Sequence, residues 1–193
     1  MPRRPPTTPC TYKAVPEPVL APSAELAKEL GLPCLLPGAS RLIIGRREWL
    51  ALPDLGIWPL KAKTDTGALS STLHAENIRL SPDGSTVHFT TFNPSGDPTH
   101  CSARVERLGR VRSSIGVSQQ RIFIQTTALV CGGFQWKILV SLCNRSDMLC
   151  PLLLGRRALA GYFLIDPLGT HLLGPRRELI RCAKNFVRTP VGD

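Results

Sequence analysis

The sequence has no apolar run that approaches the length of a membrane-spanning helix, which needs about 18 residues or more. It opens with Met-Pro-Arg-Arg-Pro-Pro, and no apolar segment follows these charged residues as it would in a secretory signal. We therefore expect a cytoplasmic protein without a membrane partner.

Metal-binding spacings are also missing. None of the seven cysteines forms a Cys-x-x-Cys pair, and none of the four histidines occurs as His-x-x-x-His or His-Glu-x-x-His. His100 and Cys101 are neighbours, but adjacent residues of a strand point to opposite faces. We expect reduced thiols, no metal site and no cofactor.

Aromatic residues are scarce, at 6%, whereas basic residues are abundant. The 24 Lys and Arg residues against 14 Asp and Glu residues give a net charge of +10, which attracts anionic partners. Nucleic-acid-binding proteins usually add interleaved aromatics or a recognisable module. We therefore interpret the charge as steering of an acidic peptide substrate, and we regard nucleic acid as the less favoured partner.

The composition divides the chain into three parts. Residues 1–40 form a Pro-rich N-terminal extension with one helix candidate at 23–30, residues 41–175 form one domain, and residues 176–193 form a basic C-terminal tail. Within the domain, roughly nine short apolar segments lie between turn signals and predict strands. They include 69–80, 103–108, 121–130, 134–142 and 171–173, and a short helix is expected after Gly155. The predicted fold is an all-β barrel with no βαβ rhythm.

The segment 60–72 contains the most informative turn of the domain. An apolar strand pattern leads to Asp65, the chain turns at Gly67, and a Ser/Thr-rich strand follows. An Asp-Thr-Gly-Ala turn is the loop with which aspartic peptidases present a catalytic carboxylate. The Asp binds and activates water, the Thr66 hydroxyl can hold the loop, and glycine allows close backbone approach.

Five blocks of sequence extend this similarity over residues 41–175. The chain resembles the retropepsin-like aspartic peptidases, and more narrowly the bacterial branch once labelled "ATP-dependent zinc protease", some members of which are associated with ATP-grasp ligases that attach glutamate tails. The blocks are residues 45–49 (Gly-Arg-Arg-Glu-Trp), 61–68 (Lys-Ala-Lys-Thr-Asp-Thr-Gly-Ala), 73–75 (Leu-His-Ala), 145–148 (Arg-Ser-Asp-Met) and 151–155 (Pro-Leu-Leu-Leu-Gly).

The resemblance implies a closed acid-protease barrel in which two apolar residues and a glycine brace the Asp loop. Asp65 would be the catalytic residue, with Thr66, Gly67 and Ala68 in its loop and Leu154 and Gly155 behind it. No second Asp-Ser/Thr-Gly occurs in the sequence. Because the mechanism needs two adjacent carboxylates, the second Asp65 should come from another copy of the chain in a symmetric homodimer. The hairpin that carries Gly116 is the flap candidate.

Substrate choice is open at this point. Arg145, Arg156 and Arg157 are candidates for binding carboxylates of a glutamate-rich peptide, although structural or solvated salt bridges are equally compatible with each. The branch usually has Arg after Asp-Thr-Gly-Ala, and this chain has Leu69, which removes one cation. Asp147 is a candidate for the second carboxylate if the enzyme is monomeric.

Two other functions remain as alternatives. The first is a catalytically idle retropepsin-like dimer that serves as an interaction module and binds an anionic partner. The second is a zinc peptidase, as in the older family label.

Overall fold

The computed structural model describes residues 41–112 and 118–188, and its largest sheet closes on itself. Strand β10 pairs with both β4 and β9, which joins the two sides of the sheet into a six-stranded barrel, and β8 extends it from β9. The prediction of an all-β barrel is confirmed. In spatial order the strands are β10 (Gln135–Cys143), β4 (Ser71–His74), β11 (Leu152–Gly155), β3 (Ile57–Asp65), β2 (Arg47–Leu52), β9 (Ser118–Leu129) and β8 (Arg107–Arg112).

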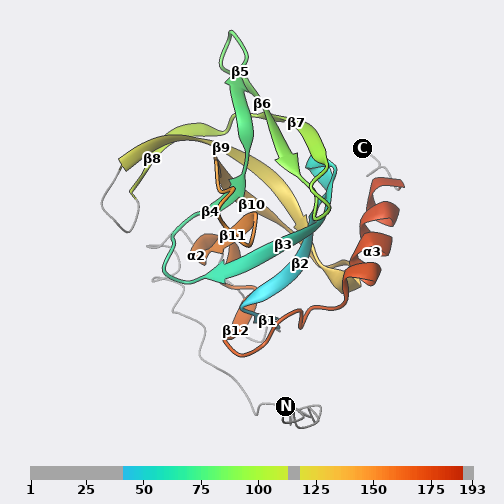
Figure 1. Ribbon diagram of the computed structural model, residues 1–193. Coiled ribbons are helices and arrows are strands. Elements are labelled where there is room, and N and C mark those ends of the chain that lie inside the picture. The colour runs from blue at the N-terminus through green and yellow to red at the C-terminus, as the bar shows by residue number, and fades with distance from the viewer. Residues whose placement is uncertain (1–40, 113–117, 189–193) are drawn as a thin grey trace, which may run out of the picture. The chain divides into compact units, whose positions relative to one another are not determined.

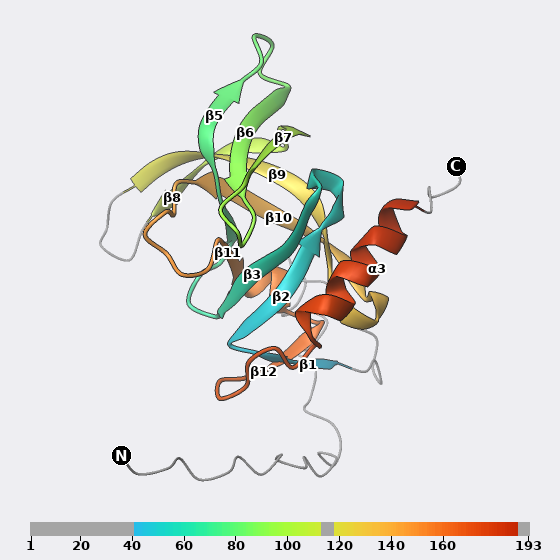
Figure 2. The same ribbon diagram turned by 45° about the vertical axis from the view of Figure 1, so that its right-hand side comes forward.

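Two smaller sheets flank the barrel. An antiparallel sheet contains β5 (Glu76–Leu80), β6 (Thr86–Phe92) and β7 (Pro98–Arg104). A parallel pair contains β1 (Leu42–Gly45) and β12 (Phe163–Asp166). Figures 1 and 2 both show the β5–β7 sheet at the top of the barrel and the β1–β12 pair at its lower end.

The barrel interior is filled by alternate residues of its strands. On β10, the side chains of Trp136, Ile138 and Val140 are buried while Lys137 is exposed, as the period-2 pattern predicts. The opposing strands contribute branched apolar side chains that have no solvent exposure, and a fully buried side chain of this size contributes about 1.5–3 kcal/mol. They are Leu50, Leu73, Ile124, Leu152 and Leu154.

Three predicted strands differ from the structure. The segment 69–80 is divided at Ala75 between β4 in the barrel and β5 in the outer sheet, and 103–108 is divided between β7 and β8. Ala75 donates its N–H to the carbonyl of Cys143 at the end of β10, so the chain leaves the barrel there. Residues 171–173 form a bend instead of a strand, with His171 at a positive φ of 57°.

The short helix α2 (Arg156–Leu159) follows Gly155 as predicted, and two 3₁₀ turns, Pro53–Leu55 and Cys131–Gly133, separate strands. The longer helix α3 (Arg176–Arg188) lies in the segment 176–193, which its composition predicted to be a basic tail without a helix. Figure 2 shows α3 beside β2 and β3, where Leu179 and Ala183 pack on Ala51. The helix candidate at 23–30 lies outside the described residues.

A buried carboxylate ties the bend at 171–173 to the start of the domain. Glu48 on β2 is 1% exposed. Its Oε1 accepts the N–H groups of Gly45 at 2.8 Å and Leu172 at 2.9 Å, and its Oε2 accepts the N–H of Leu173 at 3.3 Å. An ionised carboxylate is an acceptor at both oxygens, so it satisfies three backbone donors at once.

Replacing Glu48 with Gln is expected to destabilise the domain by about 1–3 kcal/mol, because an amide NH₂ would face at least one of these backbone donors. Urea unfolding followed by tryptophan fluorescence measures the change. Glu106→Gln, at an exposed position, is the control and should leave the midpoint nearly unchanged. Equal midpoints for Glu48→Gln and the unmodified protein would contradict the role of this carboxylate.

Candidate active site

Asp65 is the last residue of β3, and its carboxylate closes the turn that follows. Oδ1 accepts the N–H of Gly67 at 3.0 Å and the N–H of Ala68 at 3.1 Å. Within the described parts of the chain, Oδ2 has no hydrogen-bond partner, and the side chain is partly exposed. One oxygen is therefore held by the loop while the other is free to bind a water molecule or to face a second carboxylate.

The loop is also held from the side of α2. Arg156 donates from Nη1 to the carbonyls of Thr66 at 2.8 Å and Gly67 at 2.9 Å, and its backbone N–H bonds the carbonyl of Ala68 at 2.8 Å. Thr66 thus takes part through its main chain. Arg156, predicted as a candidate for substrate binding, is engaged here in bracing the Asp65 loop.

Gly155 lies directly behind the loop. It pairs in parallel register with Asp65, and its N–H donates to the buried hydroxyl of Ser71 at 3.2 Å. A Cβ at Gly155 would lie 2.5 Å from the carbonyl carbon and 2.6 Å from the oxygen of Ser70, closer than atoms can pack. The position therefore requires glycine. Leu154 beside it is fully buried in the barrel core and pairs with Thr64.

Buried hydroxyls support the strand after the loop. Ser141 Oγ donates to the carbonyl of Ser71 at 3.2 Å and lies 3.0 Å from Thr72 Oγ1. Because the Ser141 proton is used in the first bond, Thr72 donates in the second. In the sequence, the Ser/Thr-rich strand after Asp65 indicated such hydroxyl contacts. Ser141 lies 69 residues or more from Ser71 and Thr72, and no sequence pattern indicated that it contacts them.

The side chains of Arg145 and Arg157, the remaining candidate arginines, form no hydrogen bond with the Asp65 loop within the described residues. Arg145 follows β10 and is partly buried. Burial lowers the pKa of its guanidinium, and the charge of Arg121 lowers that pKa further. The nearby Cys143, Cys150 and Asp65 oppose this shift. Arg157 is exposed and lines a depression with Glu106 and Lys137. Gly116 lies outside the described residues; β8 and β9, which flank it, form an antiparallel hairpin.

No group of three or more His, Cys, Asp or Glu residues in ranges 41–112 and 118–188 is arranged to hold a metal ion. His100 is exposed while Cys101 is buried on the other face of β7, and burial raises the pKa of the Cys101 thiol to about 11. The described cysteines 101, 131, 143, 150 and 182 are free thiols. None of the described helices is long and apolar enough to cross a membrane.

Gly155→Ala is expected to destabilise the domain by about 1–3 kcal/mol, because the added methyl group forces the Ser70 backbone away. Thermal unfolding measures the loss. Gly84→Asn is the control, since Gly84 has a φ of +71° that Asn tolerates and nothing lies within 4 Å of its Cβ position. A loss no larger than that of the control would show that the close approach at Gly155 is not required.

The chain is similar in sequence to a peptidase family and to proteins named as ligases. A sequence profile described as "Retropepsin-like aspartic endopeptidase RimB" matches residues 43–173. A protein from Parasynechococcus marenigrum (strain WH8102) named "Probable alpha-L-glutamate ligase" is 36% identical over 144 residues, which cover 72% of this chain and 30% of the relative. A protein of the same name from Shewanella pealeana is 32% identical over 145 residues, with 72% and 31% covered. The chain thus spans less than a third of the length of these relatives.

A solved structure matches as well. The crystal structure of a protein of unknown function from Legionella pneumophila has a TM-score of 0.57 and 32% sequence identity, and the match covers 69% of this chain and 99% of that one. The profile spans the Asp65 loop, the Gly155 brace and the barrel that joins them. The chain therefore belongs to the RimB-like family of retropepsin-like aspartic endopeptidases.

Proposed function

We propose that the protein is an aspartic endopeptidase in which Asp65 activates water for hydrolysis of a peptide bond. The observation that carries the proposal is the asymmetry of the Asp65 carboxylate, with Oδ1 bound by two backbone N–H groups and Oδ2 free. In the mechanism, one carboxylate takes a proton from water while its protonated partner donates to the scissile carbonyl. The second carboxylate is the Asp65 of a partner copy.

Exposed apolar side chains support a homodimer. The pair β1–β12 has no further strand among the described residues, and Leu42, Ile43 and Leu164 on it are 38%, 43% and 36% exposed. Leu69, next to the Asp65 loop, is 49% exposed. A second copy that covers these side chains would remove apolar surface from water and satisfy free strand edges.

The proposed substrate is an acidic, glutamate-rich peptide. Two relatives are named as glutamate ligases, and a peptidase domain similar to part of such a protein would meet glutamate-bearing chains. The net charge of +10 favours encounter with an acidic substrate. Of the predicted substrate-binding arginines, Arg145 and Arg157 make no side-chain hydrogen bond within the described residues, and Arg145 is the one that is partly buried.

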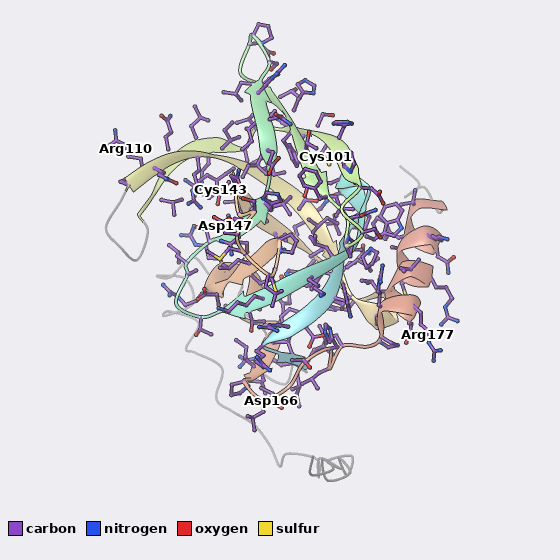
Figure 3. All side chains as sticks on the ribbon, in the orientation of Figure 1. Cys101, Arg110, Cys143, Asp147, Asp166 and Arg177 are labelled. Carbon is purple, nitrogen blue, oxygen red and sulfur yellow. The ribbon has the colours of Figure 1, made fainter. Side chains whose placement is uncertain are left out.

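Asp65→Asn is expected to abolish cleavage of a glutamate-rich peptide while leaving the fold intact, because Asn is nearly isosteric but cannot act as base. Liquid chromatography of the peptide products measures the loss. Asp147→Asn is the matched control; Asp147 is exposed on the loop after β10 and should be dispensable if the dyad is built from two Asp65 residues (Figure 3).

The unmodified enzyme should show a bell-shaped dependence of rate on pH, as a coupled pair of carboxylates does.

Other outcomes select the alternatives. Equal cleavage by the unmodified protein and Asp65→Asn would reject Asp65 as the catalyst, and loss of activity in Asp147→Asn would favour a monomeric dyad. Absence of cleavage by any form, with binding of anionic partners retained, would indicate the idle interaction module. Stoichiometric zinc that leaves together with activity would favour the zinc peptidase.

Leu164→Glu is expected to shift the protein from dimer to monomer, because a charge on β12 would be buried in the proposed interface. Sedimentation velocity at several protein concentrations measures the assembly, and peptidase activity should fall together with the dimer fraction. Leu80→Glu is the control, since Leu80 is 43% exposed on β5 and lies outside the proposed interface. Full activity in a strictly monomeric Leu164→Glu protein would contradict a dyad shared between copies.

A further inference from the structure

The loop 144–151 connects β10 to β11, and a single residue, His74, forms hydrogen bonds with both of its ends. His74 on β4 donates its backbone N–H to the carbonyl of Pro151 at 2.8 Å, and its Nδ1 accepts the backbone N–H of Arg145 at 2.9 Å. The His74 side chain is 8% exposed, and its ring stacks on Phe92 at a centroid distance of 5.7 Å. The position of Arg145 is therefore set by a buried imidazole.

The hydrogen bonds of His74 define its protonation. Because Nδ1 accepts from Arg145, the ring is neutral and carries its hydrogen on Nε2. Nε2 lies 3.6 Å from Oε1 of Glu76, the first residue of β5. The ring is thus oriented by Glu76 on one side and Phe92 on its face, and it presents an acceptor to the loop.

A second arginine approaches Arg145 from β9. Ser141 pairs with Phe123 in the β9–β10 ladder, so two residues further along each strand Arg121 lies near Cys143, which precedes the Arg145 loop. Burial lowers the pKa of the Arg145 guanidinium, and the charge of Arg121 lowers that pKa further, in agreement with this proximity. Two guanidinium groups that repel each other are thus held together, and the charge of Asp65 acts on one of them, Arg145.

Neither guanidinium has a carboxylate partner within the described residues. The Nε atoms of Arg121 and Arg145 are both buried without a hydrogen-bond partner, and the one side-chain bond of Arg121 is a 3.4 Å contact with Gln119. Among the described residues, an ion pair that an aspartate forms lies elsewhere, between Lys137 and Asp54. Partly buried arginines without an anion are costly, and a bound anion would offset both the repulsion and the lost hydration.

We propose that Arg121 and Arg145 together bind one carboxylate of the substrate beside Asp65, and that His74 is the positioning residue that holds Arg145 for this contact. The proposal rests on the proposed peptidase function for its substrate, and it assigns the group that selects an acidic side chain. The terminal nitrogens of two guanidinium groups offer several donors to the two oxygens of a carboxylate. A neutral amide has one oxygen and a competing NH₂, so a Gln side chain binds this site poorly.

Binding is measured first, in the non-cleaving Asp65→Asn background, by fluorescence anisotropy with a labelled oligoglutamate and a matched oligoglutamine. Arg121→Gln and Arg145→Gln should each weaken oligoglutamate binding about tenfold, the loss expected when a charge-assisted hydrogen bond is removed. Neither change should affect oligoglutamine. The double variant should lose less than the product of the single losses, because both side chains hold the same carboxylate. Arg79→Gln, an exposed arginine on β5, removes the same charge and should change binding less than twofold.

The role of His74 is tested by two substitutions in the cleaving enzyme. His74→Phe removes the acceptor for the Arg145 N–H and should raise KM for oligoglutamate about tenfold with little change in kcat, because the contact is a binding contact. His74→Asn places an amide oxygen near the position of Nδ1 and should restore much of the affinity. A merely structural histidine would lower kcat and thermal stability in both variants without this rescue.

The outcomes separate this inference from the peptidase function. If Arg121→Gln and Arg145→Gln bind oligoglutamate as well as Arg79→Gln does, the carboxylate site is wrong, whether or not the enzyme cleaves peptides. If the single variants lose oligoglutamate binding selectively but the unmodified protein cleaves nothing, the site is right and the peptidase proposal is wrong. Equal losses for oligoglutamate and oligoglutamine would also overturn the site, since they would indicate disrupted folding and not charge recognition.

Discussion

The architecture depends on the close approach of two backbones where β11 passes between β3 and β4. Gly155 brings its main chain against Ser70, and this contact lets a strand from the C-terminal half of the domain lie directly behind the Asp65 turn. The same contact places α2, which starts at the next residue, so that its first side chain, Arg156, reaches the two carbonyls of the turn. The absence of a side chain at Gly155 thus allows β11 to pack against the turn that carries the Asp65 carboxylate.

The arginines near the site divide into distinct physical roles. The Arg156 guanidinium donates hydrogen bonds to main-chain carbonyls of the Asp65 turn and thereby stabilises it. Arg145 and Arg121 lack such partners and keep their charges available, at the cost of partial burial. An exposed arginine such as Arg157 contributes mainly to the long-range field of a strongly basic protein. Arginines of equal charge therefore differ in whether their nitrogens are already engaged in hydrogen bonds.

The sequence was sufficient to predict structural features that depend on residues close together in the chain. The Asp65 turn, the strand expected at 134–142 and the strand-to-helix transition at Gly155 are local patterns, and all three are found where they were predicted. The break at Ala75 was missed because it is caused by a hydrogen bond to Cys143, far away in sequence. The hydrogen bonds that the His74 and Glu48 side chains accept were missed for the same reason, since their donors are backbone N–H groups, which the sequence does not distinguish. Helix α3 was hidden by its charge, which suggested a solvated tail although Leu179 and Ala183 recur at helical spacing.

The packing of α3 has a consequence for how the protein can be divided. Its apolar side covers Ala51 on β2 and Leu129 on β9, together with the flanking Trp49 and Trp58, whereas the family profile ends at residue 173. A fragment cut at the profile's border would leave a tryptophan-rich patch of the barrel wall bare to water, and such a patch invites non-native self-association. The smallest fragment that folds independently must therefore include α3, although the family profile ends before this helix.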